Sequence, residues 1–453
     1  MLDFLDRARS IAGPSYSRWL VPPAALAIHL CIGQAYAFSV FNFPLSHLIG
    51  GTQPGPDDWK LSTIGWVFSV AIVFLGVSAA AFGAWVERVG PRKAMLASAT
   101  CFGGGFLVAA AGVATHRFPL LLVGYGVIGG VGLGLGYISP VSTLINRFPD
   151  RPGMATGMAI MGFGGGAMIA SPLATILMAR FRSVAPQGVA PTFVTMGVLY
   201  FAFMMLGVLI ARTPPAGWRP EGWVPRPHGK RLVTSGDVIV NEAVKTPQFW
   251  LLWVMLCVNV TAGIGVLGQA SPMIQEMFPG AITASAAAGF VGLLSLANMG
   301  GRFFWSSLSD YIGRKATYAT FFLLGAILYA LVPSTGRAGS VALFVTGYVI
   351  IMSMYGGGFA TIPAYLRDMF GTIQVGAIHG RLLTAWSTAG VLGPVLVNYI
   401  REYEIARGVA KADAYTVTMY IMASLLVAGF ICNLLIRGVH QRHFTQELPI
   451  VVA

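Results

Sequence analysis

The chain has 453 residues, of which 56% are hydrophobic and only 10% are charged, and its mean hydropathy is +0.72. This composition excludes a soluble globular protein and indicates a membrane protein with many spans. The net charge of +13 comes from basic residues scattered among short loops, which is typical of a topology signal, so we expect no nucleic-acid partner.

The first 20 residues contain acidic side chains and lack the layout of a signal peptide, so we expect no cleavage there. The four cysteines all lie in apolar stretches: Cys31, Cys101, Cys257 and Cys432. We therefore predict no disulfide, no metal site and no cofactor.

Apolar windows of about 20 residues, the length at which a helix crosses a bilayer, predict twelve transmembrane helices and an all-α fold. The predicted spans are 18–46, 62–86, 94–114, 118–146, 154–179, 193–211, 248–275, 285–309, 316–335, 340–364, 374–399 and 415–436. A polar, proline-rich stretch divides them six and six. We predict an N-terminal six-helix bundle (1–211), a cytoplasmic linker with little fixed structure (212–247) and a C-terminal six-helix bundle (248–453).

Basic residues also indicate the orientation of the chain. Lys and Arg are more frequent in the segments that lie on the same side of the membrane as the N-terminus than in the segments on the opposite side. The positive-inside rule therefore places both termini in the cytoplasm, with the protein in the cell (inner) membrane.

The two halves share landmarks at one spacing. Glu87 and Asp310 lie 223 positions apart. The same spacing relates Gly90 to Gly313, Gly134 to Gly357, Pro140 to Pro363 and Gly157 to Gly380. This repeat indicates two halves of the same topology, as in transporters whose binding site lies between the halves.

Arg302 lies inside the predicted span 285–309, eight residues before Asp310, which is about 12 Å along a helix. At that depth in a bilayer an arginine costs about 2.5–3.5 kcal/mol and cannot escape by deprotonating. It needs a protein carboxylate or an anion from solution. No Asp or Glu lies well inside any predicted span, and Glu276 sits near the outer end of its own. The repeat partner of Arg302 is Ala79, so one half alone carries this cation.

Polar residues accompany Arg302. Ser295 and Asn298 precede it by seven and four positions, on the same helix face, which predicts a polar site lining. The alternative is a buried polar stripe satisfied by neighbouring helices. His29 and Tyr36, seven positions apart, share a face of the first span. His29 could titrate during transport, although a lone histidine on a packed helix is more often simply hydrogen-bonded.

The loop GAWVERVGPRK at 83–93 and its counterpart SDYIGRK at 309–315 resemble the signature loop of the major facilitator superfamily (MFS). Glu87 stands where that signature has Asp, and Pro91 precedes Arg92. The resemblance implies the MFS fold and a conformational latch at the cytoplasmic side. We predict that the latch consists of Glu87, Arg88, Arg92, Asp310 and Arg314. The alternative is charge that only sets topology.

A narrower resemblance covers most of the chain. The segments YAFSVF at 36–41, GYISP at 136–140, NRFPDR at 146–151 and GGR at 300–302 are similar to the oxalate/formate antiporter family, which is related to the monocarboxylate transporters. In that family an arginine of the eighth helix binds the substrate carboxylate and aromatic residues surround the anion. The resemblance assigns these roles to Arg302, Tyr36 and Tyr137, with Tyr355 a looser match.

One position departs from that family. The oxalate exchanger has a lysine in the eleventh helix, within Thr-Ala-Lys-Gly, where this chain has Trp386 within TAWS at 384–387. Two cations suit a dicarboxylate, whereas an unmatched second negative charge is costly to desolvate. Trp386 therefore favours monocarboxylates such as formate, lactate or pyruvate over oxalate. Asn298 stands where related monocarboxylate carriers have Asp, and Asn does not take up a proton at ordinary pH.

These features predict a secondary transporter of small organic anions that works by alternating access. We expect it to be a monomer in the lipid bilayer and to favour anion exchange. The predicted substrate-binding residues are Arg302, Tyr36, Tyr137, Asn298, Tyr355, Trp386 and His29. A proton-coupled monocarboxylate symporter and a non-transporting sensor with a carrier fold remain alternatives. A nucleotide phosphate loop and the common hydrolase motifs are missing from the sequence, so we do not expect an ATP-driven pump or an enzyme.

Overall fold

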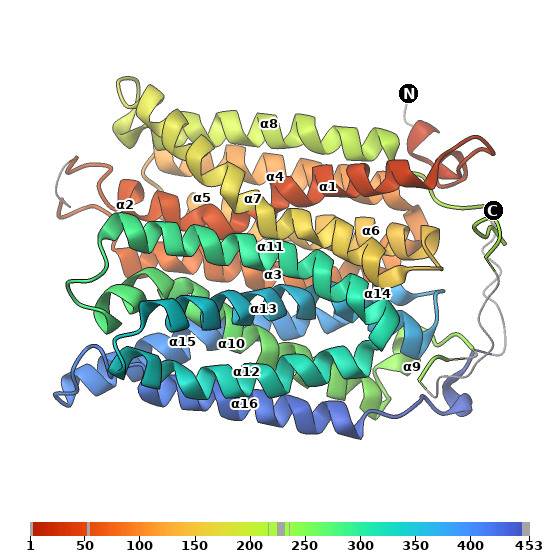
Figure 1. Ribbon diagram of the computed structural model, residues 1–453. Coiled ribbons are helices and arrows are strands. Elements are labelled where there is room, and N and C mark those ends of the chain that lie inside the picture. Colours follow the sequence, from red (N-terminus) through yellow and green to blue (C-terminus); the bar gives the residue numbers. More distant parts are fainter. Residues whose placement is uncertain (1–2, 52–54, 216, 224–231, 235, 446–453) are drawn as a thin grey trace.

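The computed structural model describes residues 3–51, 55–215, 217–223, 232–234 and 236–445. Long helices lie side by side in one bundle, and the described N-terminal and C-terminal segments lie at the same end of it (Figure 1). Within these ranges the only β-type pairing is a single bridge between Ile11 and Thr213.

The N-terminal half begins with short 3-10 turns and continues with the six predicted spans. Its elements are η1 (Asp3–Leu5), η2 (Ala8–Ser10), η3 (Arg18–Leu20), α1 (Val21–Ile32), η4 (Gly33–Phe41, 3-10), α2 (Asn42–Leu45), α3 (Leu61–Val89), α4 (Pro91–Ala114), α5 (Phe118–Leu121), η5 (Leu122–Gly129, π-helical), α6 (Gly130–Arg147), α7 (Pro152–Phe181), η6 (Pro186–Gly188) and α8 (Val189–Ile210). The first span is therefore α1, η4 and α2 in succession, and the fourth is α5, η5 and α6.

The C-terminal half repeats this pattern. Its elements are α9 (Val240–Ala243), α10 (Pro247–Met277), α11 (Ala284–Ile312), α12 (Arg314–Arg337), α13 (Val341–Phe370), α14 (Val375–Leu382), α15 (Thr384–Ala406), α16 (Thr416–Leu435) and η7 (Gln441–His443). The eleventh predicted span is divided between α14 and α15 around Leu383.

Helix starts and stops follow local chemistry. Pro91, Pro152 and Pro247 each occupy the first turn of a helix, where a missing N–H costs nothing. Gly90 and Gly313 separate α3 from α4 and α11 from α12 with φ angles of +83° and +90°, which L side chains rarely adopt. These two glycines are repeat partners, so the same sharp turn occurs once in each half.

Eleven helical spans in the described residues are long and apolar enough to cross a membrane. The helix α11, with 29 residues, is not among them. It nevertheless lies within the bundle beside the other spans (Figure 1). The all-α prediction is confirmed, and α11 supplies the twelfth predicted span.

The halves meet where α7 packs along α11 and where α3 packs against α14 and α15. A Cβ atom at Gly157 would clash with Ser306 Oγ and lie 2.9 Å from the carbonyl oxygen of Arg302. A Cβ at Gly380 would clash with the carbonyl oxygen of Ala79. Because Gly157 and Gly380 are repeat partners, as are Arg302 and Ala79, the repeat extends to the contacts between the halves.

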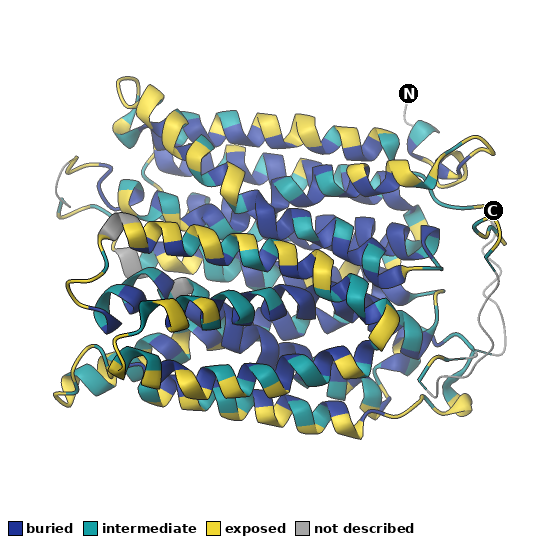
Figure 2. Ribbon diagram, in the orientation of Figure 1, coloured by how far each residue is buried: buried dark blue, intermediate teal, exposed yellow. Residues whose placement is uncertain are grey.

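Burial divides the bundle into an inner and an outer surface. Exposed residues follow the outward faces of the peripheral helices α8 and α16 (Figure 2). Many of them are large and apolar, such as Phe203 and Ile431, as expected for side chains that face lipid. All four cysteines are free.

The predicted linker is anchored at its described ends. Thr213 N donates a hydrogen bond to the carbonyl oxygen of Ser10 (2.8 Å), and Asp237 Oδ1 accepts one from Thr372 N (2.6 Å). Residues 216, 224–231 and 235 of the predicted linker lie outside the described residues. The division into bundles at 211 and 248 remains a prediction.

Candidate functional site

Arg302 is fully buried on α11, with 0% of its surface exposed. Its Nε donates to Asn298 Oδ1 (3.2 Å) and its Nη1 donates to the carbonyl oxygen of Ile160 on α7 (3.4 Å). Its Nη2 has no hydrogen-bond partner among the described residues. The guanidinium is thus held at two nitrogens by uncharged groups, and a donor remains free at the third.

No ion pair within the described part of the chain includes Arg302. Glu276, at the end of α10, is engaged elsewhere. It pairs with Arg401 and accepts a hydrogen bond from Tyr415 Oη (2.7 Å). The positive charge of Arg302 is therefore buried and uncompensated, a costly state that the binding of an anion would relieve.

Aromatic rings enclose the guanidinium. Its Cζ lies 5.7 Å from the ring centroid of Phe163 and 5.3 Å from that of Phe359, within cation–π range. The ring of Trp386 packs on both, with centroid distances of 5.3 Å to Phe163 and 4.5 Å to Phe359. Tyr36 packs edge-on to Phe163 at 5.0 Å.

Two tyrosine hydroxyls connect the halves across this cluster. Tyr36 Oη and Tyr355 Oη are 3.2 Å apart, and either can donate. Tyr137 packs on both Phe163 (5.6 Å) and Trp386 (5.3 Å). We call the set the aromatic cage; it consists of Tyr36, Tyr137 and Phe163 from the N-terminal half and Tyr355, Phe359 and Trp386 from the C-terminal half.

The structure brings together all four aromatic residues predicted for the site, and Asn298 contacts Arg302 directly. Sequence reasoning missed Phe163 and Phe359. Phe163 lies 223 positions before Trp386, so the repeat could have revealed it. Nothing in the sequence distinguished Phe359 from other apolar residues of its span.

Two histidines adjoin the cage at Tyr137. His29 Nδ1 lies 3.1 Å from the carbonyl oxygen of Ala25, and its ring centroid is 5.5 Å from that of Tyr137. His379, on α14, lies 5.7 Å from Tyr137 by the same measure. His379 was not among the predicted site residues.

The predicted latch residues form two matched contacts at the end of the bundle that carries the termini. Asp310 Oδ1 and Oδ2 accept hydrogen bonds from Gly153 N and Met154 N (both 2.9 Å), at the start of α7. Glu87 Oε1 accepts one from Gly376 N (3.0 Å), at the start of α14. Gly153 and Gly376 are 223 positions apart, so each half presents a carboxylate to a helix N-terminus of the other.

The basic latch residues behave differently from one another. Arg314 pairs with Asp310 (2.7 Å) and with Asp368 (3.0 Å). Arg92, predicted for the latch, forms no hydrogen bond or ion pair with Glu87; its Nη1 donates to the carbonyl oxygen of Phe4 (2.7 Å) and so binds the N-terminal segment. Arg88 is exposed. The repeat explains the asymmetry, because Arg314 corresponds to Pro91 and the N-terminal half has no equivalent arginine.

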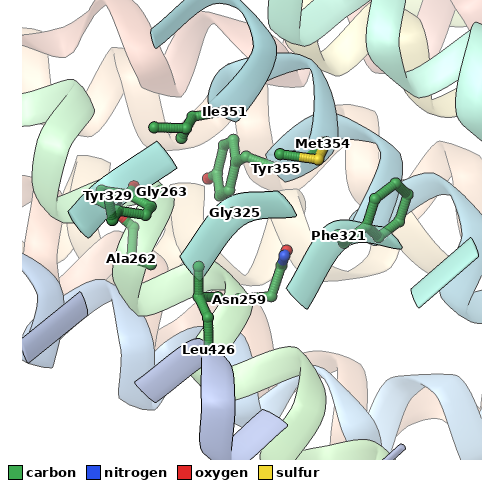
Figure 3. Close-up of a pocket in the computed structure, with 10 residues that line it drawn as sticks. All are labelled: Asn259, Ala262, Gly263, Phe321, Gly325, Tyr329, Ile351, Met354, Tyr355 and Leu426. Carbon is green, nitrogen blue, oxygen red and sulfur yellow. Dashed lines mark hydrogen bonds between the residues drawn. The ribbon is translucent and has the colours of Figure 1, made fainter. Parts of the chain in front are cut away.

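A separate pocket lies within the C-terminal half, between α10, α12, α13 and α16 (Figure 3). It is lined by Asn259, Ala262, Gly263, Phe321, Gly325, Tyr329, Ile351, Met354, Tyr355 and Leu426. Tyr355 is the one residue that it shares with the aromatic cage, so the pocket lies beside the candidate site and does not contain Arg302.

The fold and the paired latch contacts define a class of carrier, and the sequence comparison agrees. The model of the Major Facilitator Superfamily matches residues 24–394, and the chain belongs to that family. This confirms the MFS fold that we predicted from the signature loop.

Among curated proteins, the chain is similar to the oxalate:formate antiporter of Oxalobacter formigenes, with 26% identity over 83% of each chain. It is also similar to apicoplast pyruvate carrier 1 of Toxoplasma gondii, with 25% identity over 72% of this chain and 67% of the carrier. Among solved structures, the MFS transporter FucP of E. coli in its outward conformation superposes with a TM-score of 0.64 at 14% identity, covering 91% of this chain and 97% of FucP. At that identity the superposition supports the fold alone.

Proposed function

We propose that this protein is a secondary transporter of small monocarboxylates in the cell (inner) membrane, with both termini in the cytoplasm, acting as a monomer by alternating access. One observation carries the proposal: the guanidinium of Arg302 is buried between the halves with a free Nη2 and no carboxylate partner in the described part of the chain. The similarity to an oxalate:formate antiporter and to a pyruvate carrier supports a carboxylate as the anion.

Binding would proceed by charge-assisted hydrogen bonding. The free Nη2 of Arg302 donates to a carboxylate oxygen, while Asn298 and Ile160 keep the guanidinium plane fixed. The aromatic cage limits the size of the anion. Trp386 fills the place of the lysine found in the oxalate exchanger, so one cation faces one carboxylate and a monocarboxylate fits better than oxalate.

The same charge balance favours exchange over uniport. An empty carrier must carry an uncompensated Arg302 through its occluded state, whereas a loaded carrier encloses a neutral pair. Reorientation of the empty form is therefore the slow step. We expect fast counterflow and slow net efflux into an anion-free medium; net efflux as fast as exchange would count against this mechanism.

The first experiment is thermal stabilisation of the purified protein by formate, lactate, pyruvate and oxalate, because a ligand that binds the native state raises its stability. We expect stabilisation by monocarboxylates and its loss in Arg302→Gln. Arg302→Lys keeps the charge but loses the planar fork, so we expect transport to fall at least about tenfold with normal insertion.

The alternatives give different results. Stabilisation by oxalate in preference to monocarboxylates would contradict the role given to Trp386. Ligand binding without counterflow in liposomes would favour a sensor. Uptake driven by a pH gradient, without an exchangeable anion inside, would favour proton symport, for which His29 at the edge of the cage is a titratable side chain.

A further inference from the structure

Three polar side chains gather at the Tyr137 side of the aromatic cage: Tyr137 on α6, His29 on α1 and His379 on α14. The ring centroids of both histidines lie within 5.7 Å of that of Tyr137. None of the three is more than 1% exposed. Because α14 belongs to the C-terminal half, this polar cluster, like the cage, joins the two halves.

The hydrogen-bonding state of the cluster can be deduced atom by atom. His29 Nδ1 lies 3.1 Å from the carbonyl oxygen of Ala25, and a carbonyl can only accept, so Nδ1 carries the proton. Nε2 of the neutral ring is then an acceptor. Within the described ranges of the chain, this Nε2, Tyr137 Oη and both ring nitrogens of His379 have no hydrogen-bond partner.

Such a concentration of unpaired polar atoms is unusual for a protein interior, where nearly all buried polar groups are paired. Elsewhere in the site, Arg302 is bound at two nitrogens and Tyr36 and Tyr355 bond to each other, whereas Trp386 Nε1 also lacks a partner among the described residues. The cluster therefore adds free hydrogen-bonding groups beside the free Nη2 of Arg302.

We infer that His29, Tyr137 and His379 bind a hydroxyl group of the substrate, and that small hydroxymonocarboxylates are the preferred anions. This rests on the proposed function, in which Arg302 binds the carboxylate. The two anchor points adjoin the same aromatic ring: Phe163 lies 5.7 Å from Arg302 Cζ and 5.6 Å from the Tyr137 ring. Groups that touch one ring are close enough for a molecule of few carbons to reach both.

The donor and acceptor pattern selects the hydroxyl. A hydroxyl donates to His29 Nε2 and at the same time accepts from Tyr137 Oη or from the N–H of His379. An oxo group cannot donate, so it leaves His29 Nε2 unpaired. An unsubstituted acid leaves the whole cluster unpaired, and a site built to bind a hydroxyl discriminates strongly against such an analogue.

The test compares acids of one carbon skeleton. Binding of lactate, propanoate and pyruvate to the purified full-length protein is measured by thermal-shift titration, and the affinity ratio of lactate to propanoate is the readout. We expect lactate to bind about tenfold more tightly than propanoate, with pyruvate close to propanoate, because the hydroxyl alone completes the cluster.

Two variants assign that ratio to the cluster. Tyr137→Phe removes one oxygen and keeps the ring, and His379→Leu removes both nitrogens; each is expected to lower the ratio toward one. The matched control is His116→Leu, since His116 lies in the loop after α4, stacked on Trp59. In that control the ratio should equal the wild-type ratio.

The outcomes distinguish this inference from the proposed function on which it rests. Equal affinity for lactate and propanoate in the wild type would overturn the inference, whatever the variants do, and leave the proposed function standing. A ratio that persists in both Tyr137→Phe and His379→Leu would overturn it too. Failure of every monocarboxylate to bind would instead count against the proposed function.

Discussion

Arg302 donates its two hydrogen bonds to groups without charge, an amide oxygen and a backbone carbonyl. This arrangement orients the guanidinium without neutralising it. A carboxylate at the same place would pair with the arginine and compete with the anion that we propose to bind there. The amide of Asn298 is therefore suited to this position, because its oxygen can accept a hydrogen bond but cannot supply a negative charge.

Asn298→Asp tests this at the scale of one residue. The new carboxylate would lie against Arg302 Nε, so we expect affinity for monocarboxylates at neutral pH to fall by about tenfold, equivalent to about 1.4 kcal/mol. Protonation of the new carboxyl group at acidic pH would restore binding. The measurement is anion affinity between pH 5 and 8.

Asn298→Leu is the control for that experiment, since it removes the hydrogen bond and adds no titratable group. Its affinity should show no added pH dependence relative to the wild type. If Asn298→Asp bound the anion as tightly as the wild type at neutral pH, anion affinity would not depend on the uncompensated charge of Arg302.

At the scale of elements, glycines set how closely the helices of the two halves approach. Gly157 allows α7 to contact the backbone of α11 at Arg302, and Gly380 allows α14 to contact α3 at Ala79. Small residues permit such contacts in membranes, where packing and not the hydrophobic effect holds helices together. The position of Arg302 between the halves therefore depends on the lack of a side chain at Gly157 on α7.

Gly157→Ala should destabilise the contact between α7 and α11. Its methyl group would clash with Ser306 Oγ and lie 2.9 Å from the Arg302 carbonyl oxygen, and overpacking of this kind costs about 1–3 kcal/mol. Gly300→Ala is the matched control on α11, since nothing lies within 4 Å of its Cβ position. Melting temperatures should fall for the first variant only; equal melting temperatures would contradict the packing argument.

At the scale of the whole molecule, the two halves are joined at the end that carries the termini by two unequal contacts. Asp310 accepts two backbone hydrogen bonds and is paired with Arg314. Glu87 accepts one, and no ion pair in the described residues includes it. Alternating access requires both contacts to break, so the Asp310 contact should hold most of the closing free energy.

We therefore expect Asp310→Asn to open this end more than Glu87→Gln does. Hydrogen bonds to charged groups contribute about 1.5–3 kcal/mol, so the loss of the charge at Asp310 should raise the open population by about tenfold or more. Spin-label distances between the adjoining ends of α7 and α11, and of α3 and α14, would measure both openings. A larger shift for Glu87→Gln would reverse the assignment.

The sequence by itself determined the membrane spans, the two-fold repeat and the presence of one arginine, Arg302, deep within a span. These follow from hydropathy, spacing and the cost of a buried charge, which act locally along the chain. The repeat even anticipated the paired latch carboxylates, because equal topology places Glu87 and Asp310 in equivalent environments.

Only the tertiary structure decided which side chains surround the charge. Phe163, Phe359 and His379 are ordinary residues of apolar spans until α7, α13 and α14 converge on one point. Arg92 belongs to a signature loop in sequence, yet the fold of the N-terminal segment lets it donate a hydrogen bond to Phe4 O and not to Glu87. Contacts between distant segments depend on how helices pack and rotate, which no local pattern of residues specifies.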